Sequence, residues 1–94
     1  MLSQIPVDFN KVKKEKLNDE VLRAAIIGEL DTLNLYEQLA ALTDNEDIRK
    51  VMLDIAKEEK THVGELQTML LRLDREQVKE LKQGKKEVEE LTGK

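Results

Sequence analysis

The chain lacks cysteine entirely, and it has one proline and four glycines among its 94 residues. Without thiolates it cannot bind zinc through cysteine, assemble an iron–sulfur cluster or form a rubredoxin-type module. Aromatic residues are equally scarce, because Phe9 and Tyr36 are the only two. The longest wholly apolar runs have four residues, so no segment of the sequence is suited to span a membrane.

A strong charge of one sign is also missing. The formal net charge is −4, and the one basic cluster lies within residues 11–16. A nucleic-acid-binding surface normally combines a basic face with stacking aromatic residues, and neither is present. Residues 1–17 lack the apolar segment of a secretory signal. We therefore expect a cytoplasmic protein that binds neither nucleic acid nor a membrane.

The residues that the chain does use are mainly aliphatic or charged, and the charged ones make up 38% of it. With so little glycine and proline, this composition favours helices. A chain of this length forms one small domain that buries only about 60–65% of its unfolded surface. Because two helices cannot bury both of their apolar stripes alone, helical pairs of this size usually associate.

The sequence divides into an arm and a helical domain. Residues 1–17 are polar and irregular, and we interpret them as an N-terminal arm. The apolar residues with which this arm could dock are Ile5, Val7 and Phe9. The domain comprises residues 18–94. Asn18, followed by two acidic residues, is typical of a helix start, and the first helix is predicted to end near Leu42.

Two further helices are predicted after the first. The run Thr43–Glu46 has the capping-box pattern of a helix start, and the second helix is predicted to reach Leu73. Asp74–Gln77 repeats the capping signal and begins a third helix, which Gly84 is expected to interrupt. The predicted fold class is therefore all-α.

The first helix is apolar on two sides. At about 100° per residue, one stripe falls within about 100° of arc and a second occupies roughly the opposite side. The first stripe consists of Leu22, Ala25, Ile26, Leu33, Tyr36 and Ala40, and the second of Val21, Ala24, Leu35, Leu39 and Leu42. A helix that is apolar on two sides must be covered on both. The second helix can cover one side, and another molecule is the simplest cover for the other.

Three ionisable residues lie on these apolar stripes. Glu29 lies inside the first stripe of the first helix, and Glu59 and His62 lie within the single stripe of the second helix. Glu58 falls at the border of that stripe, so Glu59 is the better candidate. Inward ionisable groups need a partner or a metal ion. Four-helix di-iron proteins use a glutamate on one helix and Glu-x-x-His on another twice over, so this chain carries half of such a site.

Two chains paired about a two-fold axis would supply the missing half. Their pocket would hold four carboxylates with a charge of about −4, which two Fe(II) ions balance, while the imidazoles remain neutral ligands. Such a centre holds two iron ions per dimer and cycles between the ferrous and ferric states with dioxygen. Tyr36 lies two turns after Glu29 on the same face, where its phenol could hydrogen-bond a ligand or close the pocket.

Two alternatives remain open at this point. The inward glutamates and histidine could form a hydrogen-bonded network in a helical assembly module that binds no metal. The same ligand set also suits manganese or zinc. A haemerythrin-type site is excluded, because a single histidine cannot supply its ligands.

The runs Ile27–Asp31, Leu35–Gln38 and Glu58–His62 resemble the encapsulated ferritins, the ferritin-like cargo proteins of encapsulin nanocompartments. The resemblance covers roughly residues 18–91 and is closest to the form that is fused to the shell protein in some archaea. It implies an antiparallel two-helix hairpin plus a short C-terminal helix, two copies of which form a ferritin-like four-helix bundle. Such dimers would assemble further into a ring-shaped decamer.

The resemblance also implies a function. The expected activity is that of a ferroxidase, which oxidises Fe(II) to Fe(III) with dioxygen at a di-iron centre between two chains, while mineral accumulates in the encapsulin compartment. Glu29, Glu59 and His62 would be the iron ligands, with Tyr36 beside them. Asp31 matches a secondary metal position of the family.

This sequence departs from the family pattern at two places. Some relatives carry a glutamate immediately before the first ligand, where this chain has Gly28, and the secondary metal site is therefore in question. Encapsulin cargo usually ends in a targeting tail or continues into shell protein, whereas this sequence stops at Lys94 with neither. A truncated chain is one interpretation, and encapsulation cannot be read from the sequence itself.

Overall fold

The computed structural model describes residues 8–94, which form helices and turns. Two short 3₁₀ turns, η1 (Phe9–Lys11) and η2 (Lys14–Lys16), lead into α1 (Leu17–Leu42), α2 (Glu46–Leu73) and α3 (Arg75–Thr92). No strand occurs among the described residues, which confirms the predicted all-α class. Ile5 and Val7, which we expected to dock, lie outside this part of the chain. None of the described helices is long and apolar enough to cross a bilayer.

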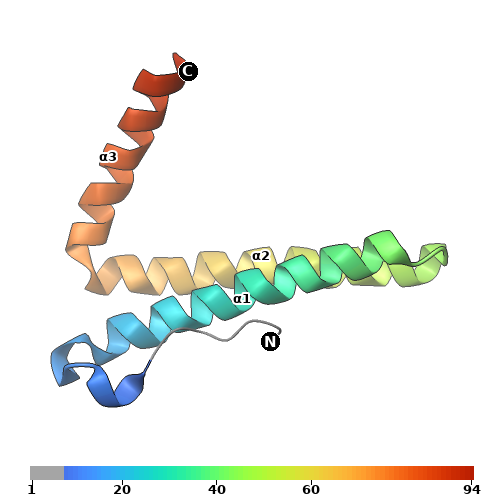
Figure 1. Cartoon of the computed structure of the whole chain (residues 1–94), viewed down its shortest axis with the longest axis horizontal. Helices are drawn as coiled ribbons and strands as arrows, with labels where there is room; N and C mark the ends of the chain where they lie inside the picture. Colours follow the sequence, from blue (N-terminus) through green and yellow to red (C-terminus); the bar gives the residue numbers. More distant parts are fainter. Residues whose placement is uncertain (1–7) are drawn as a thin grey trace.

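The helices α1 and α2 lie side by side and run in opposite directions, as Figure 1 shows. The helix α3 leaves the C-terminal end of α2 and points away from the hairpin, so that the described chain is L-shaped. Its principal extents are 47 × 43 × 20 Å. The expected antiparallel hairpin with a C-terminal helix is therefore confirmed, and the pairing of two hairpins into a four-helix bundle stays a prediction.

Asn45 and Arg49 fix the turn between α1 and α2. The Asn45 side chain accepts a hydrogen bond from the Ile48 amide at 3.0 Å and is the N-cap of α2. The Arg49 guanidinium donates to the carbonyl oxygens of Ala40 at 3.1 Å and Thr43 at 2.6 Å. Since the last carbonyls of a helix have no partner within it, these bonds satisfy groups that the end of α1 leaves open.

Two of the predicted helix caps are wrong. Thr43 does not cap α2, because it ends α1 in an extended conformation and its hydroxyl accepts a hydrogen bond from the Asn45 amide at 3.2 Å. This bond continues the turn, and the cap falls two residues later. Asn18 does not cap α1 either, because η2 runs directly into that helix, which begins at Leu17 without a side-chain cap.

Asp74 separates α2 from α3 and connects both to α1. Its side chain accepts hydrogen bonds from the Gln77 amide at 3.0 Å and from Arg23 Nη2 of α1 at 2.8 Å. Asp74 is therefore the N-cap of α3, in agreement with the capping signal in the sequence. The hydrogen bond from the Gln77 amide, followed by that from the Arg23 guanidinium, holds the pKa of Asp74 below its ordinary value of 3.8.

The helix α3 continues through Gly84, so the predicted interruption is wrong. A glycine inside a helix costs only about 1 kcal/mol relative to alanine, and the residues around Gly84 are mostly good helix formers such as glutamate, lysine and leucine. The helix ends instead before Gly93, whose φ of 75° is a conformation that glycine adopts readily.

The hairpin has a very small apolar core. Within residues 8–94 the buried apolar side chains are Ala24, Ala40, Ala56 and Leu70. Fourteen large apolar residues of the described chain are exposed instead. The other apolar residues between the helices, such as Leu22, Ile55 and Leu66, are only partly buried, so each contributes less than its full hydrophobic stabilisation. The structure therefore points to further burial of this hairpin against another surface.

Replacing Asp74 with asparagine tests how the start of α3 is held. The asparagine side chain would keep a capping oxygen but would lose the charge that pairs with Arg23, so we expect Asp74→Asn to lower the melting temperature at pH 7. Because the folded-state pKa of Asp74 is lowered, its carboxylate stabilises the fold above the unfolded pKa, and this contribution is lost as the pH falls through the folded value. The difference from wild type should therefore shrink below about pH 4.

Thermal unfolding followed by circular dichroism between pH 3 and pH 7 measures this difference. Asp54→Asn, at an exposed position of α2, is the matched control. A difference between wild type and Asp74→Asn that stays constant across this pH range would contradict a role for the ionised carboxylate.

Candidate metal centre

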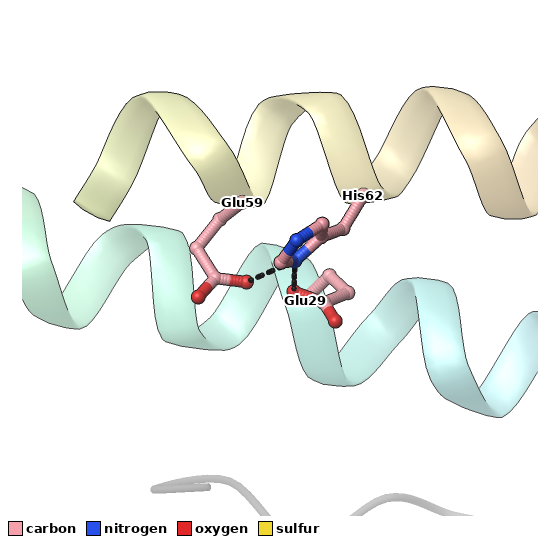
Figure 2. Close-up of side chains that lie close together, drawn as sticks. All are labelled: Glu29, Glu59 and His62. Atoms are coloured by element: carbon pink, nitrogen blue, oxygen red, sulfur yellow. Dashed lines mark hydrogen bonds and ion pairs between the residues drawn. The ribbon is translucent and has the colours of Figure 1, made fainter. Parts of the chain in front are cut away.

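Glu29, Glu59 and His62 meet between the two long helices. Glu29 lies near the middle of α1, and Glu59 and His62 lie one turn apart near the middle of α2. The antiparallel packing places these segments opposite each other, so that side chains 33 residues apart come into contact. Figure 2 shows His62 pointing toward both carboxylates, with its Nδ1 3.3 Å from Glu29 Oε2 and 3.4 Å from Glu59 Oε2.

The three side chains can offer ligand atoms that all lie within 4.8 Å of one another. Bonds of about 2.0–2.2 Å to one metal ion hold two ligand atoms at most about 4.4 Å apart. A small rotation of the flexible glutamate side chains therefore suffices to bring all three onto one ion. Two carboxylates and an imidazole suit iron, manganese or zinc. The residues present fit the metal that the sequence predicts.

Solvent exposure increases from one side of this cluster to the other. The Glu59 side chain is 13% exposed, that of Glu29 is 28% exposed and that of His62 is 45% exposed. Among the described residues, no lysine or arginine forms an ion pair with either glutamate. The carboxylates are therefore available to a cation, and the cluster can be reached from solvent on the side of His62.

His62 lies on an exposed apolar strip of α2. At about 100° per residue, Val51 and Met69 fall within about 20° of His62 around the helix, and both are exposed. On α1, the exposed residues Val21 and Leu39 fall about 80° to one side of Glu29 around the helix. Because the helices are antiparallel, the two strips adjoin on one side of the hairpin. We call this side, defined by Val21, Leu39, Val51 and Met69, the seam face.

An open hollow adjoins the cluster and is lined by Glu29, His62, Glu65 and Leu66. Glu65 is absent from the candidates that the sequence provides, because it falls outside the apolar stripe of the second helix. Its spacing of three residues from His62 is the signal that could have found it, since such residues are neighbours on a helix surface. The hollow thus adds a third carboxylate to the surroundings of His62.

Two other predicted residues lie near the cluster without joining it. Tyr36 is half-buried on α1, and its hydroxyl makes no hydrogen bond to Glu29, Glu59 or His62 within the described chain. Asp31 follows Glu29 by two residues, which is about 200° around the helix, so its side chain points away from the cluster. The roles of Tyr36 beside the metal and of Asp31 in a secondary site stay predictions.

The chain matches the protein family described as Rubrerythrin over residues 20–93. Among solved structures, the encapsulated ferritin domain from Pyrococcus furiosus is similar with a TM-score of 0.85 and 51% sequence identity, over all of this chain and 98% of that one. This similarity extends over the whole hairpin and α3.

Curated proteins are also similar in sequence. The ferritin-like–encapsulin shell fusion protein of Pyrococcus furiosus is 56% identical over 99% of this chain, which corresponds to 28% of that protein. The encapsulin nanocompartment cargo protein EncC of Myxococcus xanthus is 33% identical over 80% of this chain and 61% of its own length. The present chain therefore spans less than two thirds of either relative.

The choice of Glu59 over its neighbour Glu58 can be tested by metal binding. Glu59→Gln removes a carboxylate from the cluster, and we expect it to weaken Co(II) binding by about 100-fold or more, because even outer partners of metal ligands are worth about 10- to 100-fold. Glu58→Gln makes the same charge change at an exposed position and should bind as wild type does. Calorimetric titration with Co(II) measures both, and equal losses in the two variants would contradict the assignment.

Proposed function

The chain belongs to the rubrerythrin family, among the encapsulated ferritins, and on that premise we propose that it is a ferroxidase. In this proposal it oxidises Fe(II) to Fe(III) with dioxygen at a di-iron centre that two copies of the chain share. One observation carries the proposal: three side chains that could ligate a metal ion meet between the two helices, beside an uncovered apolar face. A ligand set in that position is incomplete in one chain and can be completed by a second.

A second copy related by a two-fold axis would both cover the exposed apolar surface and complete the ligand set. It would cover the seam face, whose exposed apolar residues the single chain leaves in water. It would also contribute a second set of Glu29, Glu59 and His62, and thus four carboxylates for two Fe(II) ions, so that the charges balance. Two hairpins joined in this way form a four-helix bundle of the ferritin-like kind.

Each side chain has a separate part in this centre. Glu29 and His62 come from different helices and would hold one iron ion within their own chain. Glu59 is the least exposed of the three and would hold iron on the side of the cluster that faces away from solvent. Dioxygen would accept one electron from each of two Fe(II) ions and, with two protons from water, would leave as hydrogen peroxide. Tyr36 would close the pocket on the α1 side, and Asp31 would contribute to a secondary metal position.

We further propose that this reaction serves iron storage inside an encapsulin compartment of the cytoplasm. Support comes from the curated relatives, of which one is fused to an encapsulin shell protein and another is an encapsulin cargo protein. The shell protein is therefore the proposed partner. Assembly of dimers into a ring-shaped homodecamer completes the proposal, since α3 extends away from the hairpin and carries exposed apolar residues of its own.

A second candidate function is a helical assembly module with a Glu–His network and no metal. The contacts of His62 with both glutamates favour it, although 3.3 and 3.4 Å are long for strong hydrogen bonds. Elemental analysis of the protein after exposure to iron separates the candidates. The ferroxidase predicts one iron per chain, the network predicts almost none, and bound manganese or zinc would instead support a relative of different metal preference.

Rapid ferrous oxidation is the direct test of the proposed activity. We expect His62→Ala to abolish the fast phase, because loss of the imidazole leaves two carboxylates that cannot hold iron in place. Stopped-flow absorbance after aerobic addition of Fe(II) measures this phase, and circular dichroism checks that helix content is kept. Glu58→Gln is the control and should retain the fast phase. A His62→Ala variant as fast as wild type would sink the assignment.

Assembly should depend on metal, because the four carboxylates repel one another until cations neutralise them. Addition of Fe(II) under nitrogen is expected to shift the sedimentation profile from single chains toward dimers or larger species. Val51→Lys places a charge on the seam face and should prevent the shift. Leu53→Lys makes the same change at an exposed position about 160° away around α2 and should not. A Val51→Lys variant that assembles with Fe(II) as wild type does would contradict the seam face as the interface.

A further inference from the structure

The hollow beside the cluster connects the candidate ligands to solvent through one more acidic residue. Glu29, His62, Glu65 and Leu66 line it, and Glu65 is exposed. Glu59, the least exposed ligand, does not line the hollow. A cation that arrives from solvent therefore meets Glu65 before it meets Glu59.

The residues of α2 form a stepped series that leads inward along this path. From Glu65 to His62 and from His62 to Glu59, each step is three residues, which is about 4.5 Å along the helix and about 60° around it. Exposure falls along the series, since Glu65 is exposed, His62 is 45% exposed and Glu59 is 13% exposed. Steps of this length can be spanned by the flexible side chains of neighbouring turns.

The electrostatics of the hollow favour a cation throughout. None of its four lining residues is a lysine or an arginine. Glu65 forms no ion pair or hydrogen bond with another described residue, so its carboxylate is not neutralised by a neighbour. Clefts lined by charge of one sign raise the local concentration of the opposite ion and its rate of association.

The position of Glu65 keeps this route open in an assembled pair. Around α2, Glu65 lies about 40° beyond Met69, at the edge of the seam face and not within it. A second copy seated on the seam face would cover Met69 and the ligands, while the edge residue remains in contact with solvent. We infer that Glu65 captures Fe(II) at the mouth of the hollow and passes it to Glu29 and His62, a role that rests on the proposed function.

Glu65→Gln tests this delivery role without oxygen chemistry, by use of Co(II) as a redox-stable probe. At low ionic strength we expect Co(II) to associate about three- to tenfold more slowly with Glu65→Gln than with wild type, with the same final number of Co(II) ions per chain. Stopped-flow absorbance measures the rate, and titration measures the number. In about 0.5 M salt the two rates should converge, because screening shortens the range of the lost charge.

Two further variants make the comparison specific. Glu65→Asp keeps the charge and should restore most of the rate, whereas Glu80→Gln makes the same charge change on the exposed surface of α3 and should leave the rate unchanged. Equal rates for wild type and Glu65→Gln would overturn the inference, and so would a lower number of bound Co(II) ions, which would make Glu65 a ligand of the centre itself. If wild type bound no Co(II), or if His62→Ala bound Co(II) as well as wild type does, the result would instead contradict the proposed function.

Discussion

The structure depends on one constraint: the hairpin of α1 and α2 has more apolar surface than two helices can bury against each other. Its buried apolar side chains are three alanines and one leucine, whereas valine, leucine and methionine residues of both helices remain in solvent. Each long helix therefore carries apolar residues that the other helix leaves uncovered. The candidate ligands lie next to the uncovered apolar surface. In the proposed dimer, a second copy would therefore bury this surface and complete the metal site together.

Metal, assembly and stability are linked through the same side chains. Glu29 and Glu59 are partly buried carboxylates whose ion contacts within the described chain are with His62. A second copy would add two more carboxylates, which opposes association until divalent cations are present. In the proposed dimer, bound iron is therefore a structural partner as well as a substrate, and the apolar seam supplies the attraction that the acidic centre alone would lack.

Local signals in the sequence were sufficient for most of the fold. The ends of both long helices at Leu42 and Leu73 and the cap at Asp74 were predicted correctly, because apolar periodicity and capping chemistry act over a few residues. The errors at Asn18, Thr43 and Gly84 have physical causes of the same short range. A preceding 3₁₀ turn, a competing hydroxyl bond and an otherwise strong helix each outweighed the single-residue signal.

By itself, the sequence determined that Glu59 and His62 stand side by side, since their spacing on one helix is fixed by the helix geometry. It also determined that Glu29 faces inward and that the first helix is apolar on two sides. Only the tertiary structure decided which pairs meet across the turn: Glu29 with His62, and Arg23 with Asp74, which are 51 residues apart and connect α1 to the start of α3. It also placed Glu65 on the rim of the hollow. Such contacts depend on how two helices slide and rotate against each other, and no local pattern of residues encodes that.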